Sequence, residues 1–352
     1  MRILVLGGTG AIGEYLVQCL KETNIEIVVT SRTYKSSEAN ICYLQGNAKD
    51  TSFLSSLLLE RWDAIVDFMV YSTNEFQSRF TLLLEATSQY IFLSSSRVYA
   101  YSKDPISEKS PRLLDVSVDQ DFLSTDEYAL AKARQENLLV NSAYKNWTIV
   151  RPYITYSEKR LQLGSLEKEE WLYRALKGKA IVFPHEMCSK LTTLTYSEDV
   201  SRGIVALIGN KKAYSEIFHI TSNIAIPWSS ILNVYLDVIM KKVGFRPKVF
   251  FVSNQNFVKC KIARYQILYD RLFDRKFDNS KISKYVKTEL FLTVETGLKK
   301  CIEEFLLNPT FKEIDWRSEA IKDRYTKERM SLKNVPGLKN KIKYLCFRFS
   351  FK

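Results

Sequence analysis

Residues 2–13 read Arg2-Ile3-Leu4-Val5-Leu6-Gly7-Gly8-Thr9-Gly10-Ala11-Ile12-Gly13, and this stretch decides the fold. A short apolar run at residues 3–6 breaks into four glycines and resumes as a helix-compatible segment at residues 11–20. This order predicts a buried parallel strand, a tight turn and the N-terminus of a helix. Backbone N–H groups and the positive end of the helix dipole meet at such a turn, so it holds the pyrophosphate of a dinucleotide.

Three of the glycines have separate roles in a loop of this kind. Gly7 lets the chain turn sharply, Gly10 omits a Cβ that would block the phosphates, and Gly13 lets the helix pack close to the strand. The backbone N–H groups of residues 9–12 then face the anion. The predicted cofactor-binding residues of the loop are Gly7, Thr9, Gly10, Ala11, Ile12 and Gly13.

Strand-like and helix-like segments alternate as far as Pro152. Strands are expected at residues 3–6, 25–30, 41–44, 64–68, 90–94 and 148–151, with helices near 11–23, 51–60, 74–88 and 126–145. This alternation predicts an α/β fold with a Rossmann-type doubly wound parallel sheet, whose ligands lie at the C-terminal ends of the strands.

A mixed pattern follows Pro152. Helices are expected near residues 164–178, 197–209, 229–243 and 254–273, and strands at 180–183 and 216–220. We therefore expect a dinucleotide-binding domain at residues 1–152, with a returning segment at about 191–222. A smaller interleaved α/β substrate-binding domain is expected at residues 153–190 and 223–315. Residues 316–352 are expected to form a basic C-terminal extension.

The composition narrows the class of protein. The chain has 352 residues, of which 46% are hydrophobic, and no apolar run approaches the ~20 residues of a membrane helix. No signal peptide is expected ahead of the first strand, and the six cysteines are scattered without a C-x-x-C pair. A reduced, cytoplasmic setting is therefore expected. With two histidines in the chain, neither a His-rich metal site nor a His-based acyl-transfer triad is expected.

The net charge of +13 is placed unevenly. Residues 322–352 carry ten Lys or Arg against Asp323 and Glu328, so most of the excess charge lies there. The segment at residues 339–349 mixes cations with aromatic side chains. One interpretation is weak contact with an anionic membrane surface or an acidic partner, and the other is a solvated terminal extension.

Hydroxyl groups follow the fifth predicted strand, in Ser94-Ser95-Ser96-Arg97-Val98-Tyr99. At the C-terminal end of a central strand, such groups lie over the reactive ring of a bound dinucleotide. Further along, Tyr128 and Lys132 are four residues apart on a predicted helix and therefore share one face. A nearby ammonium group favours the phenolate, which makes Tyr128 a candidate general acid/base.

Two other Tyr-x-x-x-Lys pairs occur in the chain. Tyr99 and Lys103 lie in a predicted loop, where this spacing does not align side chains, and Tyr173 and Lys177 lie beyond the cofactor sheet. The pair at Tyr128 follows the Ser-bearing strand and precedes the strand that ends at Arg151 and Pro152. This position in the chain order places the pair next to the predicted cofactor site. A surface contact between neighbouring side chains is the alternative interpretation.

Together these motifs resemble the extended short-chain dehydrogenase/reductases, the NAD(P)-dependent nucleotide-sugar epimerase/dehydratase family, over roughly residues 1–300. The motifs that carry the resemblance are Gly7-x-x-Gly10-x-x-Gly13, Ser94-Ser95-Ser96-Arg97-Val98-Tyr99, Tyr128-x-x-x-Lys132, Arg151-Pro152-Tyr153 and Thr195-Tyr196-Ser197-Glu198-Asp199-Val200. The resemblance implies that Ser95 holds the reacting sugar oxygen, that Tyr128 transfers the proton and that Lys132 binds the nicotinamide ribose. It further implies that Met69, Pro152 and Tyr153 contact the cofactor.

The departures from the family pattern narrow the reaction. Dehydratases of the family carry Thr-Asp-Glu where this chain has Ser95-Ser96-Arg97, so water elimination is not expected. Epimerising reductases of the GDP-fucose synthase type place a cysteine where Arg97 stands, so that chemistry is not expected either. Hydride transfer at a sugar carbon remains, as a 4-keto reductase or a 4-epimerase.

The second strand bears on the choice of cofactor. NAD-specific members end this strand with a carboxylate, whereas here it ends Val29-Thr30-Ser31-Arg32. An arginine suits the 2′-phosphate of NADP and can stack on adenine, so NADP is favoured over NAD. A solvated arginine at a strand end is the alternative. Asn47 stands where the family carries an aspartate that contacts adenine, so the resemblance implies that Asn47 contacts adenine.

The first hypothesis is therefore an NAD(P)-dependent nucleotide-sugar oxidoreductase, most simply a 4-keto reductase that supplies sugars for a surface polysaccharide, a setting that only the resemblance implies. A 4-epimerase with tightly bound NAD is the alternative reaction. A catalytically inactive member that binds RNA or a protein partner is the alternative of another class, although no nucleic acid is expected for the enzyme. The predicted substrate-binding residues are Ser96, Arg160 and Lys190, and a homodimer is an allowed oligomeric state.

Overall fold

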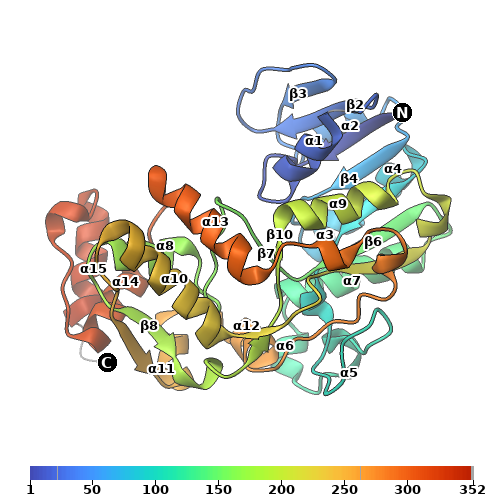
Figure 1. Cartoon of the computed structure of the whole chain (residues 1–352). Helices are drawn as coiled ribbons and strands as arrows, with labels where there is room; N and C mark the ends of the chain where they lie inside the picture. The colour runs from blue at the N-terminus through green and yellow to red at the C-terminus, as the bar shows by residue number, and fades with distance from the viewer. Residues whose placement is uncertain (22, 262, 350–352) are drawn as a thin grey trace. The chain divides into compact units, whose positions relative to one another are not determined.

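The computed structural model describes residues 1–21, 23–261 and 263–349, and the chain divides into two compact units (Figure 1). The first unit comprises Met1–Thr155, Thr193–Ile224 and Arg275–Val294. The second comprises Tyr156–Thr192, Ala225–Asp274 and Glu295–Lys352. No helix in the part of the chain that the structure describes has the length and apolar character needed to cross a bilayer.

A seven-stranded sheet in the order β11-β6-β5-β4-β1-β2-β3 forms the centre of the first unit. Every neighbouring pair in this sheet is parallel, which confirms the predicted doubly wound fold. Its strands are β1 (Arg2–Leu6), β2 (Glu26–Ser31), β3 (Ile41–Gln45), β4 (Ala64–Asp67), β5 (Tyr90–Leu93), β6 (Trp147–Pro152) and β11 (Glu216–Ile220).

Helices cover both faces of this sheet, because alternate strand residues point to opposite sides. Ile3 and Val5 pack in one core with helices α1 and α9, whereas Leu4 and Leu6 pack in the other with α2, α3, α4 and α7. The longer helices of the unit are α1 (Gly13–Lys21), α2 (Thr51–Leu57), α3 (Thr73–Gln77), α4 (Phe80–Glu85), α7 (Tyr128–Val140) and α9 (Ser197–Leu207). Its shorter elements are η1 (Ser96–Val98), α5 (Leu113–Val116), α6 (Gln120–Leu123), β10 (Leu194–Tyr196), η3 (Lys211–Ala213), η5 (Ile282–Lys284) and η6 (Thr288–Leu290). Along the chain, β7 (Ile154–Tyr156) contains the division between Thr155 of the first unit and Tyr156 of the second.

The second unit is mainly helical, with two short pairs of strands. Strands β8 (Ile181–Pro184) and β13 (Val249–Val252) pair in parallel, and β9 (Leu191–Thr192) pairs with β12 (Ile226–Pro227) in antiparallel fashion. Its helices are α8 (Lys168–Leu176), η2 (His185–Met187), α10 (Trp228–Val243), α11 (Asn254–Cys260), α12 (Arg264–Gln266), η4 (Ile267–Arg271), α13 (Val294–Leu307), α14 (Trp316–Thr326), η7 (Leu332–Asn334) and α15 (Leu338–Phe349).

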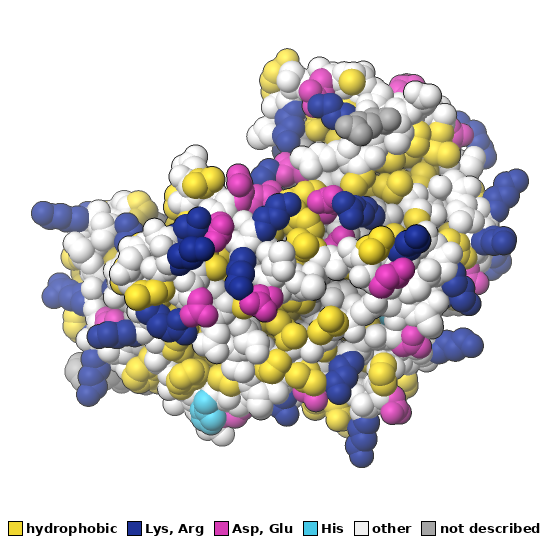
Figure 2. All heavy atoms as spheres, in the orientation of Figure 1, with side chains coloured by type: hydrophobic (Ala, Val, Ile, Leu, Met, Phe, Trp, Pro, Cys, Tyr) yellow, Lys and Arg dark blue, Asp and Glu magenta, His cyan; other side chains and the backbone are white. Residues whose placement is uncertain are grey.

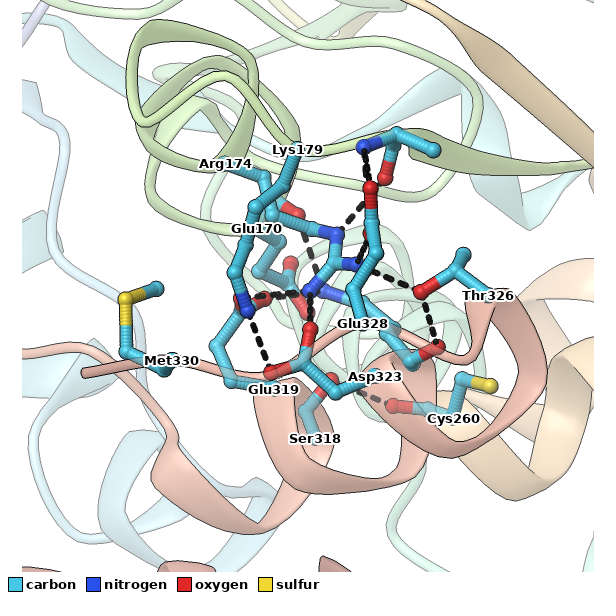
Figure 3. A network of polar contacts seen from close by, with 12 residues as sticks. Glu170, Arg174, Lys179, Cys260, Ser318, Glu319, Asp323, Thr326, Glu328 and Met330 are labelled. Carbon is cyan, nitrogen blue, oxygen red and sulfur yellow. Dashed lines mark hydrogen bonds and ion pairs between the residues drawn. The ribbon is translucent and has the colours of Figure 1, made fainter. Parts of the chain in front are cut away.

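Helices α14 and α15 lie side by side and share a small core with Trp316, Met330 and Tyr344 (Figure 1). A buried ionic network joins α14 to α8 and the start of β8 (Figure 3). The Arg174 guanidinium donates to Glu319 at 3.0 Å, to Asp323 at 2.6 Å and to Glu328 at 2.8 Å. These charges are withdrawn from water but mutually paired, so the network ties the terminal helices to the body of the unit.

Asp323 is the centre of this network. It accepts hydrogen bonds from Arg174, from the Lys179 ammonium and from the Tyr344 hydroxyl, and its side chain is fully buried. Burial alone would raise the pKa of Asp323, but the charges of Arg174 and Lys179 and the bond from Tyr344 hold this pKa below its ordinary value. The carboxylate is therefore ionised at neutral pH.

The boundaries of the two units differ from the domain boundaries expected from the sequence. Residues 275–294, expected in the substrate-binding domain, belong to the first unit, because Asn279 donates to the Thr221 carbonyl at 2.8 Å and Ile282 enters the core of the sheet. Residues 316–349, expected as a separate extension, pack within the second unit through the network at Asp323.

Two predicted helices are interrupted. The helix expected at 74–88 is divided into α3 and α4, because Ser78 ends the first helix and Arg79 leaves helical geometry with a φ of −134°. The helix expected at 254–273 is divided into α11, α12 and η4, since Lys261 takes an extended conformation. Residue 262 lies outside the described residues.

Replacing Asp323 with Asn is expected to lower the free energy of unfolding by about 3–5 kcal/mol, because Arg174 and Lys179 would lose the charge that compensates their burial. Chemical denaturation at pH 7 measures this change. The control is Asp237→Asn, which breaks an exposed ion pair with Arg246 and is expected to change stability by less than about 0.5 kcal/mol. Equal effects of the two substitutions would contradict a supporting role for the network.

Candidate active site

The glycine loop between β1 and α1 has the geometry that its sequence predicts. Gly7 has a φ of +71°, and its N–H donates to the Thr30 hydroxyl at 3.0 Å. A Cβ at Gly7 would lie 2.9 Å from the Met69 sulfur, and a Cβ at Gly13 would lie 2.6 Å from the Gly8 Cα. Because the second contact is with main chain, which cannot move aside, Gly13 sets the close packing of α1 on the loop.

The outer side of the loop is open and carries unused donors. Gly10 is exposed, and the nearest atom to a Cβ built there is 3.8 Å away. The backbone N–H groups of Thr9, Ala11 and Ile12 have no hydrogen-bond partner among the described residues. These N–H groups at the start of a helix form a cradle that fits a pyrophosphate. The loop residues predicted to bind the cofactor therefore lie together.

The ends of the neighbouring strands carry the other predicted cofactor residues. Arg32 is exposed directly after β2, and its guanidinium makes no hydrogen bond or ion pair with a residue that the structure describes. Asn47 is exposed after β3, where its side-chain oxygen accepts the Lys49 N–H at 3.1 Å. Met69 follows β4, and its backbone N–H donates to the buried Asp67 carboxylate at 2.8 Å. All three lie at the C-terminal edge of the sheet.

The three serines after β5 differ in how their hydroxyl groups are used. Ser94 donates to Glu136 at 2.5 Å, and Ser96 donates to the Arg151 carbonyl at 2.7 Å. Ser95 accepts the Arg97 N–H at 3.2 Å and donates to no described residue. The proton of the Ser95 hydroxyl is therefore available to a ligand, whereas the protons of the other two are already engaged. Ser96 is fully buried, which does not favour its predicted contact with substrate.

Tyr128 and Lys132 begin helix α7 and lie one turn apart. Tyr128 is half-buried, and its hydroxyl makes no hydrogen bond with a residue that the structure describes. Lys132 is buried, donates to the Leu93 carbonyl at 2.8 Å and to the Met69 carbonyl at 3.5 Å, and lies over the Phe92 ring. The ammonium thus bridges the ends of β4 and β5, while the phenol remains available for proton transfer.

Burial changes the titration of Lys132. Loss of hydration lowers the pKa of its ammonium to about 8, although the carboxylates of Asp67 and Glu136 act in the opposite direction. Asp67 is itself fully buried, and burial raises the pKa of its carboxyl although the Tyr90 hydroxyl donates to it at 2.8 Å. A cation with a pKa near 8 is mainly charged at neutral pH and loses its charge in mildly alkaline solution.

A buried ion pair fixes α7 against the sheet. Glu136 receives two hydrogen bonds from Arg151 of β6, at 2.8 and 2.6 Å, and a third from Arg112 at 3.2 Å. Glu136 lies one turn after Lys132 on the same helix face, so this pairing sets the rotation of the helix and with it the direction of Lys132 and Tyr128. Glu136 was not among the residues predicted from the sequence; the available signal was an acidic residue four positions after Lys132.

A second ion pair was also missed. The Arg97 guanidinium pairs with Glu127 and lies 5.4 Å from the centre of the Tyr128 ring. Glu127 also caps helix α7 by accepting the Ala129 N–H at 2.7 Å. A cation therefore occupies the position beside Tyr128 where dehydratases of the resembled family place an acid, and the adjacency of Glu127 to Tyr128 was the available signal.

The remaining predicted residues are divided between the two units. Pro152 ends β6, and Tyr153 is buried with its ring 5.2 Å from that of Phe277, both in the first unit. Arg160 and Lys190 belong to the second unit, where Arg160 pairs with Glu167 at 3.3 Å. Their contact with substrate stays a prediction. Across the described residues, no cluster of His, Cys, Asp or Glu is suited to hold a metal ion.

The chain is similar in sequence to proteins of a known family. The model of the NAD dependent epimerase/dehydratase family matches residues 3–221. The chloroplast stem-loop binding protein of 41 kDa b from Arabidopsis thaliana is 27% identical over 240 residues, 62% of this chain and 58% of that protein. The UDP-glucose 4-epimerase of Lactobacillus helveticus is 29% identical over 134 residues, 32% of this chain and 41% of that enzyme. The chain therefore spans less than two thirds of the length of either relative.

Among solved structures, UDP-glucuronic acid 4-epimerase from Bacillus cereus, in complex with UDP-glucuronic acid and NAD, is similar with a TM-score of 0.63. The similarity covers 87% of this chain and 100% of that one at 20% sequence identity. At this identity the comparison establishes a shared fold.

The lowered pKa of Lys132 predicts a pH-dependent contribution to stability. Between about pH 8 and pH 10 the unfolded chain retains a proton that the folded chain has lost, so stability should rise with pH in this window. We expect the wild-type chain to gain about 1–3 kcal/mol relative to Lys132→Met across it. Urea unfolding at pH 7, 8, 9 and 10 measures this difference.

The control is Lys284→Met, which removes an exposed lysine of the same unit. Its stability should follow that of the wild-type chain at every pH. Parallel pH profiles for wild type and Lys132→Met would contradict the burial of a titrating ammonium at this position.

Proposed function

Because the chain belongs to the NAD dependent epimerase/dehydratase family, we propose that it is an NAD(P)-dependent enzyme that transfers a hydride at a carbon of a nucleotide-linked sugar. The observation that carries the proposal is the pairing of an open glycine loop with an available Tyr128 hydroxyl in one unit. The similarity to a UDP-glucose 4-epimerase and to a structure with bound UDP-glucuronic acid and NAD supports the class of substrate.

The residues of the first unit fit a dinucleotide. The cradle of unused N–H groups at Thr9, Ala11 and Ile12 matches a pyrophosphate, and the open surface at Gly10 lets phosphates approach the main chain. When bound, the nicotinamide ring supplies the hydride or accepts it. The protein then has to orient the sugar and move one proton.

Ser95, Tyr128 and Lys132 are assigned to these tasks. Ser95 donates its free hydroxyl proton to the reacting sugar oxygen, which orients the sugar. Tyr128 gives a proton to that oxygen during reduction or removes it during oxidation. Lys132, which the family resemblance assigns to the nicotinamide ribose, contributes a positive charge below its pKa of about 8.

We favour reduction of a 4-keto sugar with NADPH. No carboxylate ends β2 to hold a ribose 2′-hydroxyl, and the exposed Arg32 guanidinium is available for a 2′-phosphate. A reductase exchanges its cofactor in every cycle, so a contact selective for NADPH is useful to it. The supply of sugars for a surface polysaccharide is the setting proposed from the family resemblance, and a cytoplasmic location is proposed from the scattered cysteines.

The 4-epimerase remains the alternative within the family. A 4-epimerase regenerates its cofactor internally and has no need of a 2′-phosphate contact. Protein that purifies with bound NAD⁺ and interconverts two sugar nucleotides without added cofactor would establish the epimerase in place of the reductase.

Tyr128→Phe is expected to lower kcat by ~10²–10⁴-fold, because the phenol transfers a proton, and to leave the affinity for NADPH nearly unchanged. NADPH oxidation with 4-keto sugar nucleotides measures the rate, and fluorescence titration measures the affinity. The control is Tyr173→Phe, which alters the Tyr-x-x-x-Lys pair on helix α8 of the second unit. A Tyr128→Phe enzyme that keeps more than about a tenth of kcat would remove Tyr128 from this role.

Arg32→Ala tests the cofactor preference. If Arg32 meets the 2′-phosphate, the substitution weakens NADPH binding by about 1.5–3 kcal/mol, the range for hydrogen bonds to charged groups, and leaves NADH binding little changed. Titration of both cofactors against the wild-type and variant proteins measures this. Equal losses for the two would show that Arg32 only stacks on adenine, which contradicts the NADPH preference.

A second candidate function rests on the plant relative, which is named for stem-loop binding. The net charge of +13 suits a polyanion, and Lys and Arg side chains are spread over the face in Figure 2 among acidic and hydrophobic ones. Salt-dependent binding of an RNA stem-loop, measured beside NADPH oxidation, separates the two functions. Tight RNA binding without turnover would favour the binding protein, while turnover without RNA binding favours the enzyme.

A further inference from the structure

Helix α15 carries an exposed apolar stripe along its outer side. Leu338, Ile342, Cys346 and Phe349 are exposed and stand at positions i, i+4, i+8 and i+11. At 100° per residue these four positions fall within roughly 80° of the helix circumference, so they form one continuous line. Leu338 is 74% exposed, Ile342 53% and Phe349 52%. We call these four residues the terminal stripe.

The opposite side of the same helix is firmly held. Tyr344 is buried, and its hydroxyl donates to Asp323 at 2.5 Å and accepts the Met330 N–H at 2.7 Å. Phe347, on the far side from the terminal stripe, and Leu345, at the edge of the stripe, pack against the core formed with Trp316. Because the inner side is fixed in this way, the helix cannot rotate to bury the terminal stripe against its own unit.

The charges on the helix are all of one sign. The segment Leu338–Phe349 contains Lys339, Lys341, Lys343 and Arg348 and no carboxylate. Lys339 and Lys341 flank the terminal stripe on its two sides, whereas Lys343 pairs with Asp315 at 3.3 Å. Lys333, on the preceding η7, adds another exposed cation. The stripe is thus an apolar line with a cationic border.

We propose that the terminal stripe, with Lys339 and Lys341, is a docking surface for an anionic lipid bilayer. Helix α15 lies in the plane of the headgroups, with Leu338, Ile342 and Phe349 inserted among the upper acyl chains and the two lysines at the anionic headgroups. Amphipathic helices with apolar side chains on one face and lysines on their borders bind membranes in this way. The apolar and cationic parts of the surface each find a partner in the same bilayer.

Other occupants match this surface less well. A nucleic acid would satisfy the lysines, but its phosphates offer no partner to the aliphatic side chains of Leu338 and Ile342. A second copy of the helix would cover the apolar line and would bring the lysines of the two copies together without intervening carboxylates. The uniform positive border favours an anionic partner, and the exposed aliphatic line favours one with an apolar interior.

Sedimentation of the full-length protein with phosphatidylcholine vesicles, with and without phosphatidylglycerol, tests the proposal. We expect binding only to the vesicles that contain phosphatidylglycerol, and weaker binding at high salt. Ile342→Asn together with Phe349→Ser should lower the binding constant by roughly tenfold or more, because the inserted apolar area is lost. Lys339→Gln together with Lys341→Gln should lower it by a similar factor, since each lysine near an anionic surface contributes roughly fivefold.

Matched controls alter the same side-chain types elsewhere. Leu290→Asn with Leu307→Ser removes two exposed leucines outside α15, and Lys284→Gln with Lys287→Gln removes two exposed lysines of the first unit. Both controls should bind vesicles as the wild type does. Thermal unfolding of each variant verifies that it is folded.

Three results would overturn the proposal. The first is no preference for phosphatidylglycerol, and the second is equal binding by the stripe variants and their controls. The third is a protein that ignores vesicles but binds RNA or an acidic polypeptide through Lys339 and Lys341, or that dimerises through the terminal stripe. Since none of these measurements uses turnover, their outcome is independent of the proposed hydride transfer.

Discussion

The pairing of Glu136 with Arg151 is the constraint on which the candidate site depends. Both side chains are almost completely buried, so their charges are tolerable only because the two groups meet in a bidentate arrangement and share the site with Ser94. This contact locks helix α7 to the ends of β5 and β6. The available hydroxyl of Tyr128, the ammonium of Lys132 and the free proton of Ser95 all take their directions from that one junction.

Lys132 shows how function and stability compete in this unit. Its ammonium is buried between main-chain carbonyls, and burial lowers its pKa even though Asp67 and Glu136 lie close enough to oppose the shift. A core of this kind would be more stable with an apolar side chain at that position. The chain keeps a charged lysine where the proposed proton transfer needs a positive charge. The carboxylates around it reduce the loss of stability that the burial of this charge causes.

Much of the fold was predictable because its signals are local. The seven strands of the parallel sheet and the glycine loop follow from apolar runs and backbone freedom, which short stretches of sequence record. The hydrogen bonds of the three serine hydroxyls were not predictable, because they depend on which groups of α7 and β6 lie against them. Glu136 is 42 residues from Ser94, and no local pattern joins the two.

The boundaries of the two units escaped prediction for a similar reason. From the sequence, Glu319 and Asp323 were expected in a basic terminal extension. In the structure they are buried and pair with Arg174, which lies 149 residues before Asp323. Charged side chains are usually exposed, but these are buried because they pair with partners far away in the sequence. The placement of residues 275–294 likewise depends on tertiary hydrogen bonds such as that from Asn279 to Thr221.

The buried Arg174 has a consequence for how this chain tolerates shortening. Its guanidinium has its carboxylate partners on α14 and in the turn that follows, so a chain that ended before Trp316 would leave a cation in apolar surroundings. Arg174 on α8 and the carboxylates on and after α14 therefore depend on one another. Loss of α14 therefore costs more stability while Arg174 is charged than it would with a neutral side chain at that position.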